Sequence, residues 1–256
     1  MVVDARWYYK GNIKVGNIAT FSTLPSDREF ETKYGIVKGT CDKCCCEHCG
    51  YAKDGKRPPC YVFKSHRYQS VIDSQARNTL SIRNNTELAF QQLSDSLKRK
   101  RKMPTAARYH QSGEFEINSG NGERELTGMC KVAVDHPRMP FYDYTKAYGV
   151  VIPALLNGDV PRNLTIDISI WHEQGIEEYL SVAHLPNVKA FVYCDKNKDP
   201  INGWGVEEYA QHGIIIQTFC GAYDFHGKMN HNVTCDRCTK CFNRSSKAKV
   251  IGTWDH

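Results

Sequence analysis

The stretch Asn163-Leu-Thr-Ile-Asp-Ile-Ser-Ile170 decides the fold class, because its apolar and polar residues alternate as they do in a β-strand. Gly175-Ile-Glu-Glu-Tyr-Leu180 follows it and has the composition of a short helix. The next part of the chain repeats this order, with an apolar run at 188–194 and a helix-like segment at 205–210. A strand followed by a helix, repeated along a chain, is the pattern that produces a parallel β-sheet.

On both sides of this stretch the chain contains further units of the same kind, about six strand-then-helix units in all. The predicted strands cover 34–40, 106–110, 141–146, 163–170, 188–194 and 213–220. The clearest of the other predicted helices covers 85–97, and two more begin near residues 68 and 153. We therefore predict an α/β fold: a single-domain partial (β/α) barrel, in which 1–35 form an N-terminal arm, 36–220 a barrel-like core and 221–256 a cysteine-rich segment.

Composition limits the class of protein. The chain has 256 residues, of which 41% are hydrophobic and 24% charged, as in ordinary globular proteins. We see no export signal and no apolar run long enough to span a bilayer, so we expect a cytoplasmic protein without membrane contact. Twelve cysteines in a reducing compartment favour metal binding over disulfides. The net charge of +6 permits contact with nucleic acid without requiring it.

The densest group of cysteines lies between residues 41 and 60. It comprises Cys41, Cys44, Cys45, Cys46, Cys49 and Cys60. Two ligand sets remain open, because Cys41, Cys45 and Cys49 are evenly spaced, whereas replacing Cys45 by Cys46 gives a final gap of two residues. Because this stretch follows the predicted strand 34–40, we expect cysteine-rich loops at the C-terminal ends of the strands.

A second group, Cys235, Cys238 and Cys241, has gaps of two residues. Such spacing lets successive thiolates approach different irons of a [4Fe–4S] cluster, and the surplus of cysteines also favours iron–sulfur chemistry. A structural zinc ion is the alternative, and it needs a fourth ligand. Cys130, Cys194 and Cys220 are isolated and are interpreted as small buried residues, although Cys194 and Cys220 end predicted strands.

Polar residues also follow the predicted strands, where parallel sheets bind their ligands. Ser112, Gly113 and Glu114 follow strand 106–110, and Lys146 follows strand 141–146. The alternative for 112–114 is an ordinary turn after a strand, and the alternative for Lys146 is a solvated lysine at a strand end. His110 could be a reactive group, and the alternative is a buried histidine whose hydrogen bonds are satisfied. The run Lys98-Arg-Lys-Arg-Lys102 fits a solvated helix end or a phosphate contact.

Several motifs resemble the phage gene product 88 family, in the expected order and from about residue 11 onward. They are Cys60-Tyr61-Val62, Tyr68-Gln-Ser-Val71, Arg77-Asn-Thr-Leu80, Arg108-Tyr-His-Gln-Ser-Gly-Glu114, Tyr144-Thr-Lys146, the final cysteine triad and Trp254-Asp-His256. The resemblance implies a phage or prophage origin, hence a host cytoplasm, and a cysteine-bound metal centre.

The chain is also distantly similar to radical S-adenosylmethionine (SAM) enzymes. That resemblance implies a radical-SAM-like barrel whose first strand is followed by cluster cysteines and whose second is followed by a Gly-Gly-Glu-like motif that holds the SAM amino group. Ser112-Gly113-Glu114 takes the place of this motif, with Glu114 and Lys146 as catalytic candidates. This chain differs from radical SAM enzymes in the spacing of its cysteines. Cys41-x4-Cys46-x2-Cys49 is one residue longer than the usual Cys-x3-Cys-x2-Cys of those enzymes. If Cys60 or the C-terminal triad fills the open iron position, SAM chemistry is excluded at that cluster.

Two hypotheses about function follow. The first is an iron–sulfur protein of phage type on a radical-SAM-like barrel, acting as a redox or SAM-dependent enzyme with SAM as its small-molecule partner. The second is a nucleic-acid-binding phage protein that carries a structural zinc ion and has no catalytic activity.

Overall fold

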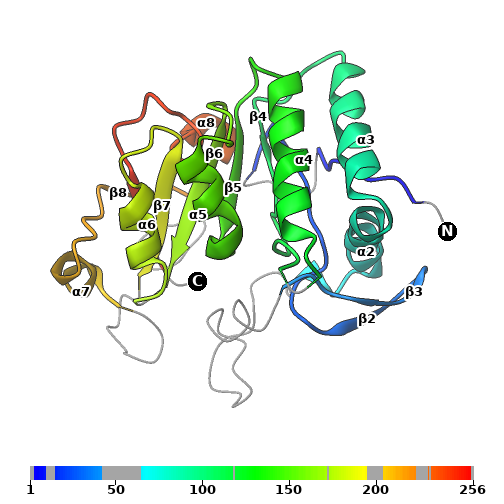
Figure 1. The fold of residues 1–256 in the computed structure, drawn as a ribbon, viewed down its shortest axis with the longest axis horizontal. Coiled ribbons are helices and arrows are strands. Elements are labelled where there is room, and N and C mark those ends of the chain that lie inside the picture. The colour runs from blue at the N-terminus through cyan, green and yellow to red at the C-terminus, as the bar shows by residue number, and fades with distance from the viewer. Residues whose placement is uncertain are drawn as a thin grey trace.

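The fold was obtained as a computed structural model that describes residues 3–9, 15–41, 65–117, 119–171, 173–194, 204–222, 230 and 232–254. Its centre is a sheet of seven strands in the order β1-β4-β5-β6-β7-β9-β8, all of them parallel (Figure 1). The strands are β1 (Ile18–Thr20), β4 (Ala106–Arg108), β5 (Phe141–Thr145), β6 (Leu164–Ile170), β7 (Val188–Cys194), β8 (Thr218–Phe219) and β9 (Val250–Trp254). The curled parallel sheet confirms the predicted α/β class and partial barrel.

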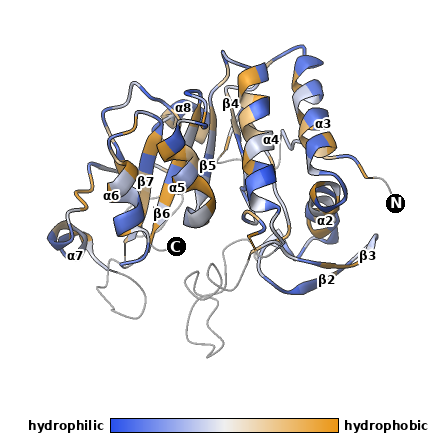
Figure 2. Cartoon of the chain, in the orientation of Figure 1, coloured by the Kyte–Doolittle hydropathy of each residue, from blue (hydrophilic) through white to orange (hydrophobic). Residues whose placement is uncertain are grey.

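Helices of the crossover connections cover one face of the sheet. They are α2 (Gln69–Asn84), α3 (Thr86–Lys98), α4 (Gly122–Asp135), α5 (Tyr148–Asn157), α6 (Ile176–Val182) and α7 (Val206–Gln211). Figure 2 shows hydrophobic and hydrophilic residues alternating along α3, as expected for a helix with one buried face. Its buried residues include Phe90, Leu93 and Leu97, which join the main core. No helix in the described ranges is long and apolar enough to cross a membrane.

The two faces of the sheet differ in chemistry because side chains alternate along each strand. In β6, Leu164, Ile166 and Ile168 belong to the core shared with the helices. Asp167 lies between them in the strand and is therefore directed to the other, concave face, where Tyr142 and Ala106 pack against Phe242 of the C-terminal segment. This concave face is the interior of the partial barrel.

The predicted first core strand, 34–40, is wrong as a strand of the sheet. Its residues form β3 (Gly35–Lys38), which pairs antiparallel with β2 (Glu29–Thr32) in a separate two-stranded ribbon. In β3 only Val37 is buried, whereas a strand inside a parallel sheet is covered on both faces. The first sheet strand is β1, within the segment predicted to be an arm, so Cys41 follows a ribbon rather than a barrel strand.

Candidate metal centre

The C-terminal cysteines lie on a short turn of chain packed against the concave face. Cys235 and Cys238 begin and end the four-residue helix α8 (Cys235–Cys238), and Thr239 with φ of 56° then turns the chain toward Cys241. Asp236 Oδ2 accepts a hydrogen bond of 2.9 Å from the backbone N–H of Asn17, just before β1. The triad is thus anchored to the first strand of the sheet.

A fourth cysteine joins this triad in space. Cys220 follows β8, and its backbone N–H donates to the carbonyl of Gly252 in β9 at 2.8 Å. Cys220, Cys235, Cys238 and Cys241 line one cavity of about 30 Å³, and all four are partly buried. From the sequence, Cys220 was interpreted as an isolated buried residue. The only feature that pointed to a role in a site was its position at the end of a predicted strand.

Lys240, between the two last cysteines, ties their loop to the strand that precedes Cys220. Its Nζ donates to Thr218 Oγ1 at 2.7 Å and to the carbonyl of Phe219 at 3.1 Å. The buried Lys189 of β7 reaches the same loop, since its Nζ donates to the carbonyls of Lys240 and of Asn243. These bonds hold the two cysteine-bearing segments beside each other.

Two thiols of this site, those of Cys235 and Cys241, have a raised pKa. Burial raises the pKa of Cys235 to about 11. Burial, and then the charge of Asp167, raises the pKa of Cys241 well above its ordinary value. A metal would therefore displace protons from these thiols as it binds. In the described part of the chain, no three His, Cys, Asp or Glu side chains stand in a ready-made metal arrangement, so the thiols would have to converge on the ion.

Charged side chains on the concave face surround the cysteines. Burial raises the pKa of Asp167 well above its ordinary value, an effect that Lys189 and Arg108 oppose. Neither carboxylate oxygen of Asp167 has a hydrogen-bond partner among the described residues. Arg108 lies over the ring of Tyr144, 4.5 Å from its centroid. The two cations would offset the negative charge of a thiolate-bound metal.

The first cysteine group is described only at its beginning. Cys41 is partly buried, while Cys45, Cys46, Cys49 and Cys60 lie outside the described residues, as does Cys44. The ribbon that leads to Cys41 and the helix α8 lie toward opposite ends of the sheet (Figure 1). The structure therefore does not bring Cys41 together with Cys235, Cys238 and Cys241.

Cys41 instead follows a residue that contacts the predicted SAM-binding turn. Thr40 Oγ1 accepts a hydrogen bond of 3.1 Å from the backbone N–H of Glu114. Ser112 Oγ donates to the carbonyl of Thr23 at 3.0 Å, and Gly113 has φ of +85°, where a Cβ would also clash with Thr23. The residue that precedes Cys41 and the turn 112–114 thus lie in contact at one edge of the sheet.

Glu114 connects this turn to the end of β5. Its carboxylate accepts from Thr145 Oγ1 at 2.8 Å, from the backbone N–H of Lys146 at 2.8 Å and from its neighbour Phe115 N–H at 3.0 Å. Burial raises the pKa of Glu114. The two catalytic candidates are therefore brought together, but through the backbone of Lys146, whose side chain is only partly buried. A SAM amino group would have to compete with these donors for the carboxylate.

A buried ionic cluster lies under the same edge, on the helix-covered side of the sheet. His110 Nδ1 is 2.9 Å from Asp143 Oδ2, and His110 Nε2 is 3.5 Å from Glu125 Oε2 of α4. Burial alone would lower the pKa of His110, but the two carboxylates outweigh it and raise that pKa well above the ordinary value. The sequence named His110 but missed Asp143 and Glu125, whose partners become apparent only in three dimensions. All three side chains are buried in the fold.

The comparisons with known proteins agree with the motif resemblance. No curated protein and no solved structure gave a significant match. The family model described as gene product 88 matches residues 9–244, a span that includes both cysteine groups and the strands β1 to β8. This match confirms the predicted phage family, and the chain belongs to the gene product 88 family.

Proposed function

We propose that the protein is an iron–sulfur protein whose best-supported centre uses Cys220, Cys235, Cys238 and Cys241 as ligands. The observation that carries this proposal is that four thiols from two separate segments line a single cavity. Four cysteine thiolates are the usual ligand set of [2Fe–2S] and [4Fe–4S] clusters. Arg108 and Lys189 on the same face supply positive charge near the anionic cluster.

Anaerobic purification tests the proposal. The expected product is brown, contains iron and labile sulfide in about equal amounts, as a cubane cluster requires, and gives an electron paramagnetic resonance signal after reduction. A colourless protein without iron, isolated under the same conditions, contradicts it.

A mononuclear zinc site is the second candidate, and the size of the cavity favours it. A cavity of about 30 Å³ suits a single ion better than the eight atoms of a cubane. Four thiolates at about 2.3 Å also satisfy tetrahedral zinc. One zinc ion per chain, without sulfide, in protein prepared from cells supplied with both metals would establish this alternative.

A SAM-dependent reaction would take place at the first cysteine group rather than at this centre. Four protein ligands would leave no open iron at the Cys220 site, whereas Cys41 lies next to the turn 112–114. The test is reductive cleavage of SAM by the reconstituted protein. Cleavage that is lost in Glu114→Gln, with both iron content and unfolding free energy retained, supports the role; absence of cleavage from the wild type contradicts it.

A further inference from the structure

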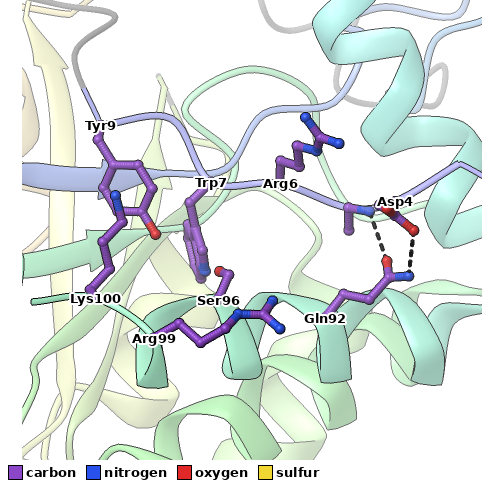
Figure 3. A pocket seen from close by; sticks show the side chains of 9 residues that line it. Asp4, Arg6, Trp7, Tyr9, Gln92, Ser96, Arg99 and Lys100 are labelled. Carbon is purple, nitrogen blue, oxygen red and sulfur yellow. Dashed lines mark hydrogen bonds between the residues drawn. The ribbon is translucent and has the colours of Figure 1, made fainter.

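A second cavity, whose lining residues include no cysteine, lies between the N-terminal segment and the end of α3 (Figure 3). Its volume is about 340 Å³, within the range of small ligand pockets. Tyr9 and Trp7 contribute aromatic surface, and the cations are Arg6, Arg99 and Lys100. The pocket therefore combines a cavity, aromatic rings and cations, and it is a candidate ligand site separate from the metal centre.

The walls of this pocket are fixed by hydrogen bonds. Trp7 Nε1 donates to the carbonyl of Leu93 at 3.0 Å, and the backbone N–H of Ala5 donates to Gln92 Oε1 at 2.9 Å. Gln92 Nε2 in turn donates to Asp4 Oδ1 at 2.8 Å, as Figure 3 shows. The extended segment is thereby held against α3, and the hollow between them is a built feature of the fold.

The cations around the pocket lack acidic partners in the described part of the chain. Arg6, Arg99 and Lys100 are exposed and form no ion pair there, and the exposed Arg101 and Lys102 continue the run. The negative end of a helix dipole corresponds to about half a charge, which is less than the charge of these cations. Adjacent unpaired cations repel one another, and an anionic ligand relieves that repulsion.

The aromatic ring distinguishes a nucleic acid from a simple anion. Lys100 Nζ lies over the half-buried Tyr9 ring, 3.4 Å from its centroid, so this cation covers one face of the ring when no ligand is bound. Single-stranded nucleic acid uses this combination, with phosphates on cations and bases against aromatic rings. A duplex keeps its bases stacked inside and could use only the cations.

We propose that this pocket binds single-stranded nucleic acid, with phosphates on Arg6, Arg99 and Lys100, and that Lys100 moves off the Tyr9 ring to its phosphate so that a base stacks on the face it leaves. This binding is independent of the metal centre. With three phosphate contacts, the affinity should fall about twentyfold between 50 and 200 mM salt, since each contact in a single strand contributes about −0.7 to the logarithmic slope.

Fluorescence anisotropy of a labelled 20-nucleotide oligothymidine tests the proposal on the full-length protein. The double variant Arg99→Glu/Lys100→Glu should bind at least tenfold more weakly. The matched control, Arg124→Glu/Arg162→Glu, changes two exposed arginines that do not line the pocket and should bind like the wild type. Each double variant lowers the net charge from +6 by four, to +2, so the comparison separates the pocket from overall charge.

The ring is tested by Tyr9→Leu, which should weaken oligothymidine binding about fivefold or more through lost stacking. Circular dichroism checks that each variant is folded, and Arg6→Glu replaces any variant that is not. No binding at 50 mM salt, equal losses in the two double variants, or tighter binding of duplex than of single strand would each overturn the proposal.

Discussion

Replacing Asp143 by Asn should destabilise the protein strongly, because it removes the closest ion-pair partner of a fully buried histidine. Asp143 Oδ2 lies 2.9 Å from His110 Nδ1, and both side chains are essentially inaccessible to solvent. Asparagine preserves the shape of the side chain but not its charge. The imidazolium of His110 would then retain only Glu125, at 3.5 Å, or would have to lose its proton inside the core.

The size of the effect follows from that burial. Removing one partner of a buried ion pair costs about 3–5 kcal/mol, because an uncompensated charge remains. The total free energy of unfolding of a domain is about 5–15 kcal/mol, so this loss is a large fraction of it. For a chain of this length each kcal/mol lowers Tm by about 2–4 °C, and the expected decrease is therefore about 6–20 °C.

Urea denaturation followed by circular dichroism at pH 7, together with thermal melting, measures this change. Asp95→Asn is the matched control, since Asp95 pairs with Lys98 at 3.5 Å while its side chain is 43% exposed. The control should lose less than about 1 kcal/mol. A loss below about 1 kcal/mol in Asp143→Asn, equal to that of the control, would refute the reasoning.

Three further predictions concern pH, the turn 112–114 and the cysteine loop. The free energy of unfolding should fall as pH rises above about 6.5, because folded His110 keeps a proton that the unfolded chain releases. The free energy of unfolding should change by at most about 1.4 kcal/mol per pH unit, and this dependence on pH should be weaker in His110→Gln. Gly113→Ala should destabilise the protein more than Gly120→Ala does in urea titrations, since both glycines have positive φ but only a Cβ at Gly113 meets a neighbouring side chain. Lys189→Met leaves two backbone carbonyls without their donor, so it should cost about 2–4 kcal/mol and speed alkylation of Cys241 in metal-free protein, measured by mass spectrometry.

The central strands could be predicted from the sequence because burial on both faces leaves a clear apolar pattern. β5, β6 and β7 lie within one residue of their predicted limits. β1 has only three residues, and the alternating apolar residues around it were interpreted as part of an N-terminal arm rather than as a strand of the sheet. The run 34–40 misled because it is apolar, yet Ile36 in it is 69% exposed and the strand forms a ribbon outside the sheet.

The candidate site was predictable where the chemistry is local and unpredictable where tertiary contacts create it. The triad Cys235, Cys238 and Cys241 is evident from its spacing, whereas Cys220 lies fifteen residues away from Cys235 and joins only because β8 and β9 pair. Helix α4 was also missed. Its Leu126, Met129 and Val132 have helical spacing, but the buried Glu125 interrupts the apolar pattern because it serves the His110 cluster.

The metal content of Cys220→Ala, compared with that of Cys130→Ala, tests the central claim most directly. Both cysteines are partly buried, but only Cys220 lines the cavity with the C-terminal triad. After anaerobic purification, elemental analysis should show that Cys220→Ala has lost one complete centre while Cys130→Ala retains the wild-type content. Equal metal content in the two variants would contradict the four-cysteine centre.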